Sequence, residues 1–302
     1  MTGPVVRHVD AKSIVSKTDL PVGDFAANPY VGCTHACRYC YASFMKRFTG
    51  HPEPWGDFLD VKHWPAIRDP SIYAGKEIFI GSVTDPYNPQ EAECQRTRTL
   101  LKQLEGSGAR ISIATKSDLV LRDIDIISTF PDARVSISIN TLEESFRRDM
   151  DSAAPISRRL DALRTLHDAG IRTTCFISPI FPGITDPKEI IRRAMDRCNL
   201  VWLENLNLRG TFRNDVMGYI EERRPDLLPL YERIYVKRDP TYWADLDGEM
   251  AEFCRNIGLE YVTNDDTARR PLEDPPIVVN YFYHERIRKS ARGDARCRSC
   301  QR

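Results

Sequence analysis

The sequence predicts an α/β fold built on a parallel β-sheet, and three observations support this prediction. Five short segments are rich in Ile, Val, Phe and Thr, and several are apolar at both odd and even positions: EIFIG (77–81), RISIAT (110–115), RVSISI (134–139), RTTCFIS (172–178) and LVWLENL (200–206). Strands covered on both faces of a parallel sheet have this pattern. Helical segments separate these strands. The strand–helix–strand unit recurs about every 25–35 residues, which is typical of βαβ units.

The segments between the strands carry the signals of amphipathic helices. ECQRTRTLLKQLEGSG (93–108) and ISRRLDALRTLHDAG (156–170) place Leu and Ala at helical intervals and end in Gly, a common C-terminal signal. We expect an earlier strand to end near Tyr30 and Val31, which makes six strands. Six strands fit an open partial barrel, a partial (β/α)6 arrangement, but the pattern alone does not distinguish it from a flat doubly wound sheet.

The chain is expected to have three parts. These are an N-terminal segment (1–24), the partial barrel (25–210) and a C-terminal extension with a basic, Cys-bearing tail (211–302). In the extension the strand–helix rhythm breaks, because residues 210–245 are aromatic and contain Pro. A helix is predicted from about Asp247 to Ile257, and the short strand LEYVT (259–263) follows it.

Composition limits the class of protein. The 302 residues include 43 Lys and Arg and 43 Asp and Glu, and a neutral chain is not a general nucleic-acid binder held by phosphate charge alone. The sequence has no run of about 18 apolar residues, so we expect no membrane span. The N-terminus, MTGPVVRHVDAKSIVSK, lacks the apolar stretch of a secretory signal, so we expect a cytoplasmic protein.

Nine cysteines are many for such a chain, and their number is odd. In a reducing compartment, clustered cysteines indicate metal binding or catalysis more often than disulfides. Three lie within eight residues. The Cys297-x2-Cys300 pair at the C-terminus offers half of a metal site, a redox pair or a free tail. The remaining cysteines are interpreted as small buried hydrophobic residues: Cys94, Cys175, Cys198 and Cys254.

The segment NPYVGCTHACRYCYA places Cys33-x3-Cys37-x2-Cys40 directly after a predicted strand. Three thiolates leave one iron of a 4Fe–4S cubane without a protein ligand, and an open iron can bind the amino and carboxylate groups of S-adenosylmethionine (SAM). An electron from the cluster then cleaves SAM to methionine and a 5′-deoxyadenosyl radical. Tyr39 would pack over the cluster or the nucleoside. The alternative is a zinc knot with a histidine, at position 35 or 51, as fourth ligand, although zinc sites usually pair cysteines as C-x2-C.

Cys-x3-Cys-x2-Cys with an aromatic residue before the third cysteine resembles the radical SAM superfamily. Further stretches resemble its subgroup related to spore photoproduct lyase: SVTDPYNPQE (82–91), TKSDLVLRD (115–123), VSISINTLEE (135–144), RRLDALRTLHDAGI (158–171) and SPIFPGITD (178–186). The match covers about residues 25–210, and within the subgroup the chain is similar to radical SAM mobile pair protein B. The resemblance implies a partial (β/α)6 barrel with SAM at the C-terminal strand ends.

The resemblance also implies roles for polar residues at these strand ends. Thr84 and Asp85 would contact the methionine ammonium of SAM, and the alternative is that Asp85 caps a Pro-rich turn. Lys116 would pair with the SAM carboxylate, unless it is an ordinary solvated lysine. Ser138 and Asn140 would contact the ribose or the carboxylate, unless they make ordinary strand-end hydrogen bonds.

Later segments complete the expected site. Arg159, rather than Arg158, would bind the SAM carboxylate in a bidentate manner, and a solvated surface arginine is the alternative. The apolar residues Pro179, Ile180 and Phe181 would form a wall for adenine, unless they belong to the core. The four polar residues that end the sixth strand are candidates for contacts with substrate or SAM, or for a network that fastens the sheet: Glu204, Asn205, Asn207 and Arg209.

Three functions follow from this pattern. The first is an enzyme whose adenosyl radical abstracts hydrogen from an unknown substrate, with a reductant such as flavodoxin or ferredoxin. The second is DNA-lesion repair, which the lyase resemblance and the basic tail suggest and which net neutrality opposes. The third is a non-enzymatic iron–sulfur or zinc sensor. The mobile-pair resemblance implies a second radical SAM protein as partner, and the fold does not identify the substrate.

Overall fold

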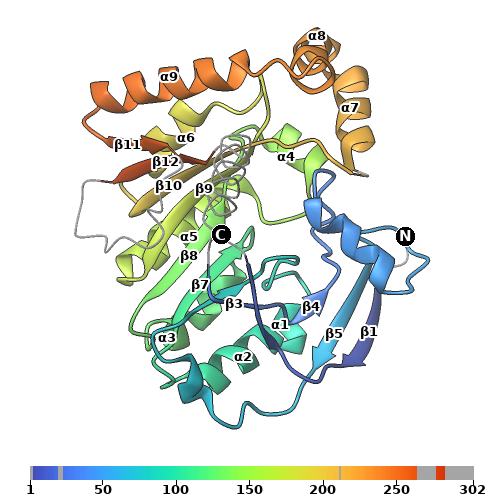
Figure 1. Cartoon of the computed structure of the whole chain (residues 1–302), viewed down its shortest axis with the longest axis vertical. Coiled ribbons are helices and arrows are strands. Elements are labelled where there is room, and N and C mark those ends of the chain that lie inside the picture. The colour runs from blue at the N-terminus through green and yellow to red at the C-terminus, as the bar shows by residue number, and fades with distance from the viewer. Residues whose placement is uncertain (1–2, 20–22, 211, 264–276, 283–302) are drawn as a thin grey trace, which may run out of the picture.

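The computed structural model describes residues 3–19, 23–210, 212–263 and 277–282. At its centre lies a nine-stranded sheet in the order β11-β12-β10-β9-β8-β7-β6-β3-β2 (Figure 1). Neighbouring strands are parallel except for the antiparallel pair of β2 and β3. The strands are β2 (Val15–Lys17), β3 (Phe25–Ala27), β6 (Glu77–Ile80), β7 (Arg110–Thr115), β8 (Ala133–Ser138), β9 (Arg172–Ile180), β10 (Leu200–Asn205), β11 (Glu260–Thr263) and β12 (Val278–Phe282).

The prediction of an α/β fold with six consecutive parallel barrel strands is confirmed by β3 and β6 to β10. The five apolar segments became β6 to β10. The position expected for the first strand was wrong, because the strand in the sheet is β3, whereas Tyr30–Val31 forms β4 in a separate sheet. Pro29 lies between these two strands and has no N–H to continue a ladder, so the chain leaves the large sheet there.

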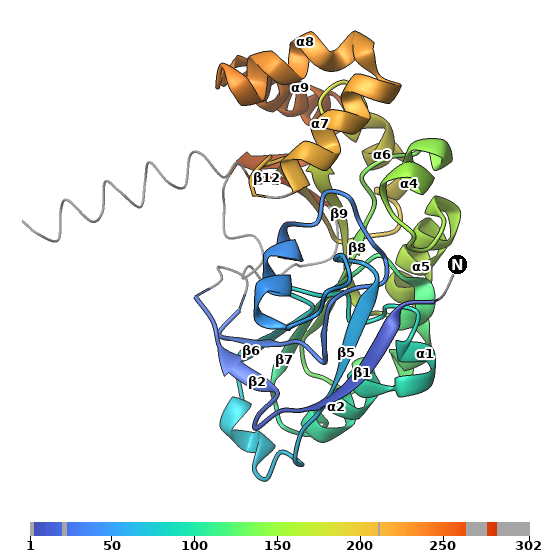
Figure 2. The ribbon, with the colours of Figure 1, turned by 90° about the vertical axis from the view of Figure 1, so that its right-hand side faces the viewer.

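A second sheet of three strands, in the order β1-β5-β4, flanks the barrel strands. β1 (Val5–Asp10) pairs in parallel with β5 (Phe58–His63), and β5 pairs antiparallel with β4. Figure 2 shows β1 and β5 side by side. The β-branched segment VVRHVD carried a signal for β1 that the sequence analysis did not use. This sheet holds the end of β4, from which the three-cysteine segment begins.

Helices follow the barrel strands and bury their apolar faces against them. The helices are α1 (Glu91–Cys94), α2 (Arg96–Leu104), α3 (Ile124–Ile127), α4 (Glu144–Met150), α5 (Ile156–Asp168), α6 (Pro187–Ala194), α7 (Phe212–Arg223), α8 (Leu228–Tyr231) and α9 (Thr241–Asn256). Short 3₁₀ turns are η1 (Tyr41–Phe48), η2 (Pro70–Tyr73), η3 (Asp118–Asp123) and η4 (Pro225–Leu227), and η5 (Glu232–Val236) is π-helical. Figure 2 shows α4, α5 and α6 along the same side of the sheet.

The hydrophobic core lies between the sheet and these helices. Ile78, Ile113 and Val135, from three neighbouring strands, are fully buried together with Leu163 and Leu166 of α5. Fully burying one such side chain stabilises the fold by about 1.5–3 kcal/mol. Apolar residues at helical spacing therefore fix which face of α5 meets the sheet, and the strand ends that follow are placed with it.

The C-terminal segment contributes both a helical layer and two strands. α7, α8 and α9 gather at one end of the molecule (Figure 1), and β12 adds to the edge of β10 in parallel register. The predicted strand at 259–263 is confirmed as β11, but β12 was not predicted despite its β-branched and aromatic run. The Cys297–Cys300 pair and its basic neighbours lie outside the described residues. Among the described helices, none is long and apolar enough to span a bilayer.

Candidate functional site

The three-cysteine segment forms a tight loop at the end of β4. The backbone N–H of Ala36 donates to the Cys33 carbonyl at 3.2 Å, and that of Cys40 donates to the Cys37 carbonyl at 3.1 Å. Gly32 precedes the loop with φ +87°, and a Cβ atom there would lie 2.5 Å from a backbone oxygen of the neighbouring β5 strand. Only glycine fits this close approach without strain, so the backbone itself fixes where the first cysteine begins.

The loop is held from its other side by the segment that follows α4. The N–H of Arg38 donates to the Met150 carbonyl at 2.9 Å, and the N–H of Ser152 donates to the His35 carbonyl at 2.7 Å. Between these two bonds lies Asp151, which is 3% exposed. Two reciprocal backbone bonds therefore place a buried carboxylate directly beside the cysteine loop.

Burial dominates the chemistry of the three thiols. Cys33 is buried, Cys37 and Cys40 are half-buried, and none of them forms a disulfide. Burial raises the pKa of Cys33 and Cys40, and it raises that of Cys37 to about 12. Thiolates bind metals, and a bound metal ion deprotonates its thiol ligands. Three unbridged thiols on one loop therefore fit a metal group that supplies the positive charge.

Of the two histidines considered as the fourth ligand of a zinc site, His51 has other partners. Among the described residues, no three His, Cys, Asp or Glu side chains gather at the spacing of ligands of one metal ion. His51 is already engaged, because its ring nitrogens each lie 2.9 Å from a carboxylate oxygen, of Glu53 and of Asp60. These contacts argue against His51 as the fourth ligand of a zinc knot.

The Asp85 side chain joins the cysteine loop to the residues that follow β6 and β7. Its carboxylate accepts hydrogen bonds from the Tyr87 N–H at 2.9 Å, the Thr115 hydroxyl at 2.6 Å and the Lys116 N–H at 2.7 Å, and it lies 3.2 Å from His35 Nε2. Burial alone would raise the pKa of Asp85, but His35 and these donors lower it to about 2. The carboxylate therefore caps the Pro-rich turn, and a contact with the SAM ammonium stays a prediction.

Thr84 also supports the loop in this structure. Its hydroxyl donates to the Gly32 carbonyl at 2.6 Å, and the residue is buried. This hydrogen bond joins the end of β6 to the first turn of the cysteine loop. Any direct contact of Thr84 with SAM stays a prediction, since its donor is used to hold the loop.

Tyr39 faces the interior, where its hydroxyl donates to Asp151 at 3.0 Å. Its ring packs edge-on against Phe181, with ring centroids 5.3 Å apart, and the Lys116 ammonium lies 5.6 Å from the ring centroid. Burial would lower the pKa of Lys116, but the nearby Cys37 and Asp151 raise it. The structure thus brings a half-buried cation to the cysteine loop, as the SAM carboxylate would require.

Arg159 is an interior residue, unlike its neighbour Arg158. Arg159 is 1% exposed, and its guanidinium lies 2.6 Å from the Asp151 carboxylate and also donates to the Ala154 and Ser138 carbonyls. The Arg158 side chain is 62% exposed and pairs with a surface carboxylate on η3. Arg159 is therefore not the solvated surface residue of the alternative, and its expected role at the SAM carboxylate stays a prediction.

Two asparagines at the strand ends carry unpartnered polar atoms. Asn140, after β8, is 2% exposed and its Nδ2 has no hydrogen-bond partner within the described part of the chain. Asn205, at the end of β10, is 6% exposed and its Oδ1 is equally unpartnered there. Ser138 is also buried near them. Leaving such groups unpaired costs about 1–3 kcal/mol each, so both amides are suited to a ligand.

Of the remaining residues predicted for the site, some belong to the hydrophobic core and others are partly exposed. Ile180 and Phe181 are fully buried and pack within the hydrophobic clusters, whereas Pro179 is half-buried. Glu204 accepts a hydrogen bond from the Ser178 hydroxyl at 2.5 Å. A role for the three apolar residues around adenine therefore stays a prediction, and Pro179 is the member that retains exposed surface.

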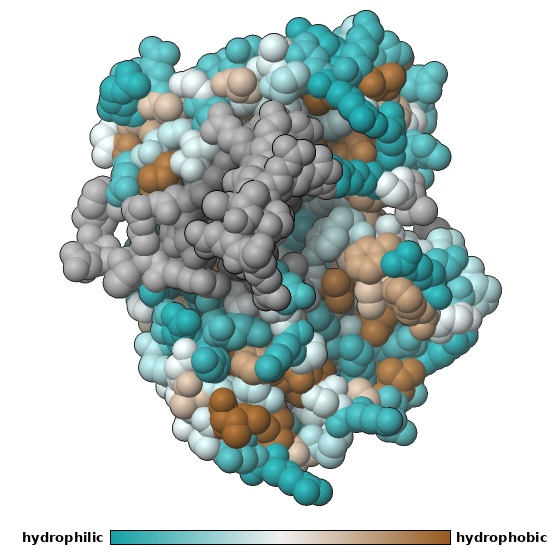
Figure 3. All heavy atoms as spheres, in the orientation of Figure 1, coloured by the Kyte–Doolittle hydropathy of each residue, from teal (hydrophilic) through white to brown (hydrophobic). Residues whose placement is uncertain are grey.

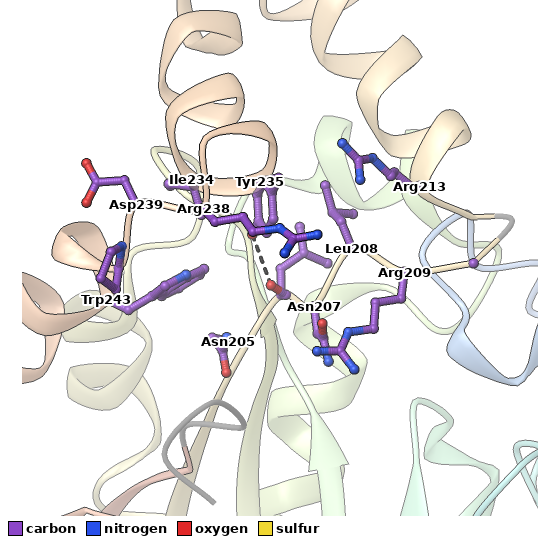
Figure 4. Close-up of a pocket in the computed structure, with 13 residues that line it drawn as sticks. Asn205, Asn207, Leu208, Arg209, Arg213, Ile234, Tyr235, Arg238, Asp239 and Trp243 are labelled. Carbon is purple, nitrogen blue, oxygen red and sulfur yellow. Dashed lines mark hydrogen bonds between the residues drawn. The ribbon is translucent and has the colours of Figure 1, made fainter. Parts of the chain in front are cut away.

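A pocket of about 490 Å³ opens beside the end of β10. Its lining includes Asn205, Asn207 and Arg209, which the sequence predicted, and residues of α7 and of the π-helical segment (Figure 4). The lining also includes three residues that were not predicted from the sequence, Arg213, Arg238 and Trp243. No local signal identified them, because they come from the segment where the strand–helix rhythm ends.

The rim of the site differs on its two sides. On the η1 side, Tyr41, Phe44 and Phe48 are exposed directly after the last loop cysteine, and Arg47 lies 4.6 Å from the Phe48 ring centroid. On the opposite side, the surface over α7 to α9 is mostly hydrophilic (Figure 3). The rim is therefore aromatic beside the cysteine loop and polar beside β10.

The scattered cysteines behave as the sequence predicted, with one difference. Cys175, Cys198 and Cys254 are buried, as small hydrophobic residues are, whereas Cys94 is half-buried. Burial raises the pKa of Cys198 to about 12 and that of Cys254 to about 11. These thiols therefore belong to the fold and stand apart from the loop.

Comparison with known proteins identifies the family. The family model of the radical SAM superfamily matches residues 27–194. An uncharacterized protein of Methanocaldococcus jannaschii is 36% identical over 223 residues, covering 73% of this chain and 84% of that protein. One from Acidianus two-tailed virus is 33% identical over 262 residues, covering 78% and 80%. The chain belongs to the radical SAM superfamily.

Solved structures agree on the fold. A spore photoproduct lyase complexed with dinucleoside spore photoproduct has a TM-score of 0.59 at 13% identity, covering 92% of this chain and 82% of that one. A mutant of that lyase with bound AdoMet has a TM-score of 0.55 at 13% identity, covering 72% and 67%. The predicted resemblance to this subgroup is thus confirmed at the level of the fold.

Proposed function

We propose that the chain is an enzyme in which Cys33, Cys37 and Cys40 hold a 4Fe–4S cluster that binds SAM. When bound, the cluster would supply the electron that cleaves SAM to methionine and a 5′-deoxyadenosyl radical, which abstracts hydrogen from the substrate. The observation that supports this proposal is the loop of three unbridged thiols, which contacts Thr84 and Asp85 after the C-terminal end of the parallel strand β6. Ligands bind at these strand ends in α/β folds.

Some residues around the loop would bind SAM or substrate, and others would hold the loop in position. Lys116 supplies a cation for the SAM carboxylate, because it is half-buried beside Tyr39 and makes no ion pair among the described residues. Asn140 and Asn205 offer a donor and an acceptor with no protein partner in the described structure. Asp85 and Asp151 are positioning residues that hold the loop and its aromatic side chain in place.

The electron would come from a separate protein, since the described chain offers one metal-binding loop. A small reductant of the flavodoxin or ferredoxin type matches this need, and a reducing cytoplasm would keep the three thiols free to bind iron. The aromatic rim at η1 keeps the loop close to the surface, where an electron donor can approach.

Anaerobic reconstitution tests the proposal directly. The full chain, loaded with iron and sulfide and reduced with dithionite, should hold about four irons and release 5′-deoxyadenosine from SAM. Cys37→Ala should abolish product formation, since it removes one ligand of the cluster. Cys94→Ala is the matched control, because that thiol lies outside the loop and should leave the product yield unchanged.

Two results would contradict the proposal. One is a purified, oxygen-free protein that carries stoichiometric zinc in place of iron and sulfide. The other is undiminished release of 5′-deoxyadenosine by Cys37→Ala, which would place the reaction elsewhere. Circular dichroism of both variants separates loss of chemistry from loss of fold.

A further inference from the structure

The pocket beside β10 has a strong positive charge. Arg209, Arg213 and Arg238 line it, and none of the three forms an ion pair within the described residues. The one acidic residue in the lining, Asp239, is engaged: its carboxylate accepts from the Thr241 N–H at 2.9 Å and lies 3.7 Å from Arg233, outside the pocket. Three guanidinium groups around one cavity repel each other unless an anion joins them.

The backbone around Arg238 is unusual. It follows the π-helical turn Glu232–Val236, and its φ angle is +58°, in the left-handed region that residues other than glycine rarely adopt. Such conformations are strained and concentrate at functional sites, as π-helical turns do. Figure 4 shows the Arg238 side chain reaching over the chain at Leu208, and Arg209 turned back beside Asn207.

A buried acceptor points to the same cavity. Asn205 is 6% exposed, lines the pocket and has an Oδ1 atom without a partner among the described residues. The pocket lining therefore includes one buried acceptor and three guanidinium groups. Because Asn205 also ends β10, the pocket adjoins the strand ends where we place SAM.

We propose that this pocket binds a phosphate group of the substrate, with Asn205 accepting from a neighbouring hydroxyl or N–H of the same molecule; the proposal rests on the function proposed above. Arginine forks match phosphate oxygens in a bidentate manner, in a phosphate monoester as well as in a phosphodiester. A cavity of about 490 Å³ has room for more than a bare anion. The substrate is therefore a phosphorylated compound or a phosphodiester.

Calorimetric titration of the cluster-loaded full chain tests this inference, with pyrophosphate as the probe and malonate as the carboxylate comparison. Arg213→Ala and Arg238→Ala should each weaken pyrophosphate binding about tenfold, as expected for loss of a charge-assisted contact. Arg238→Gly should do the same while relieving the backbone strain, which keeps the test valid if the alanine variant folds poorly.

Matched controls remove the same charge nearby. Arg223→Ala lies at the other end of α7, and Lys237→Ala changes the residue before Arg238; neither lines the pocket. Each should change pyrophosphate affinity less than threefold. Equal losses in controls and pocket variants, unchanged affinity in the pocket variants, or malonate binding as tight as pyrophosphate would each overturn the proposal.

A ten-nucleotide single-stranded oligothymidylate distinguishes the two sources of phosphate. If it binds and loses affinity in the same arginine variants, the substrate is a phosphodiester; if pyrophosphate alone binds, it is a small phosphorylated molecule. Both outcomes support the proposal that the pocket binds a phosphate group. The titration requires no turnover, so a failure to form 5′-deoxyadenosine would defeat the proposed function and leave the phosphate result readable.

Discussion

Two groups of buried polar side chains in this molecule differ in one respect: whether the protein itself completes their hydrogen bonds. Beneath the cysteine loop lies the Glu91 network, which we define as Tyr30, Glu91, Arg98, Arg122 and Asp123. The Glu91 carboxylate accepts from Arg122 at 2.6 Å and from the Tyr30 hydroxyl, and Asp123 accepts from Arg98 at 2.7 Å. Both carboxylates are fully buried.

At the C-terminal ends of the barrel strands, some buried polar groups have no hydrogen-bond partner among the described residues. Asn140 and Asn205 are nine-tenths buried with an unpartnered atom each, in the described structure, and Lys116 meets a ring face rather than a carboxylate. A fully satisfied network stabilises one fold, whereas an unsatisfied one is stable only when a ligand completes it. The contrast teaches which buried polar groups serve the fold and which serve a ligand.

Breaking the Glu91 network should have the largest effect on stability. Glu91→Ala removes the carboxylate that four donors share, among them the Tyr30 hydroxyl and the Arg122 guanidinium, and leaves Arg122 with Asp123 as its buried partner. We expect a loss of about 4 kcal/mol in the free energy of unfolding, measured by urea denaturation. Glu93→Ala, an exposed glutamate on the same short helix, is the control and should cost less than about 1 kcal/mol.

The adjacent arginines of α5 provide a second test of the comparison. Arg159→Ala strips the buried Asp151 of its counter-ion and should lower the free energy of unfolding by about 3 kcal/mol. Arg158→Ala breaks an ion pair whose arginine is largely exposed, and it should cost at most about 1 kcal/mol. Thermal unfolding of both variants measures the difference, and equal costs would remove the distinction between the two positions.

Removing a polar group that has no protein partner among the described residues should affect ligand binding more than stability. Asn140→Ala should change the free energy of unfolding by less than about 1 kcal/mol, because its Nδ2 has no protein partner to lose among the described residues. It should weaken SAM binding about tenfold, measured by equilibrium dialysis against the cluster-loaded protein. Marked destabilisation with unchanged SAM affinity would assign this asparagine to the fold.

The smallest effect concerns the cysteines outside the loop. Burial raises the pKa of Cys198 to about 12, so at pH 8 its thiolate fraction is far below that of a free thiol. Iodoacetamide should therefore leave Cys175 and Cys198 unmodified in the native protein, by mass spectrometry, and modify them once the chain is unfolded in urea. Rapid native alkylation of either would show that this part of the core opens.

The hydrophobic pattern of the sequence predicted much of the fold. Five apolar segments became β6 to β10, and the helix over 156–170 became α5, because periodicity and a final glycine are local properties. The first barrel strand was misplaced by a few residues because Tyr30 and Val31 read as strand equally well. β12 was missed, since its place beside β10 depends on a pairing between residues far apart in the chain.

The candidate site also has a part that the sequence predicted and a part that depends on contacts between distant segments. The loop of Cys33, Cys37 and Cys40 stands in one short segment, and its spacing was sufficient to predict the family, whereas the cluster stays a prediction. The hydrogen bonds that occupy Asp85 and Arg159 come from distant segments, so their use in holding the loop was not visible. The same residue types serve as cofactor ligands elsewhere, and type alone does not tell which role applies.

The sequence by itself determined the alternation of strands and helices and the three-thiol loop, because hydrophobic period and ligand spacing are written along the chain. Only the tertiary structure decided which polar groups are satisfied and that Arg213 and Arg238 line one pocket beside the end of β10. Hydrogen-bond partnership and charge density depend on distances through space between segments far apart in the chain. Those distances are set by packing, and packing appears only when the whole sheet has formed.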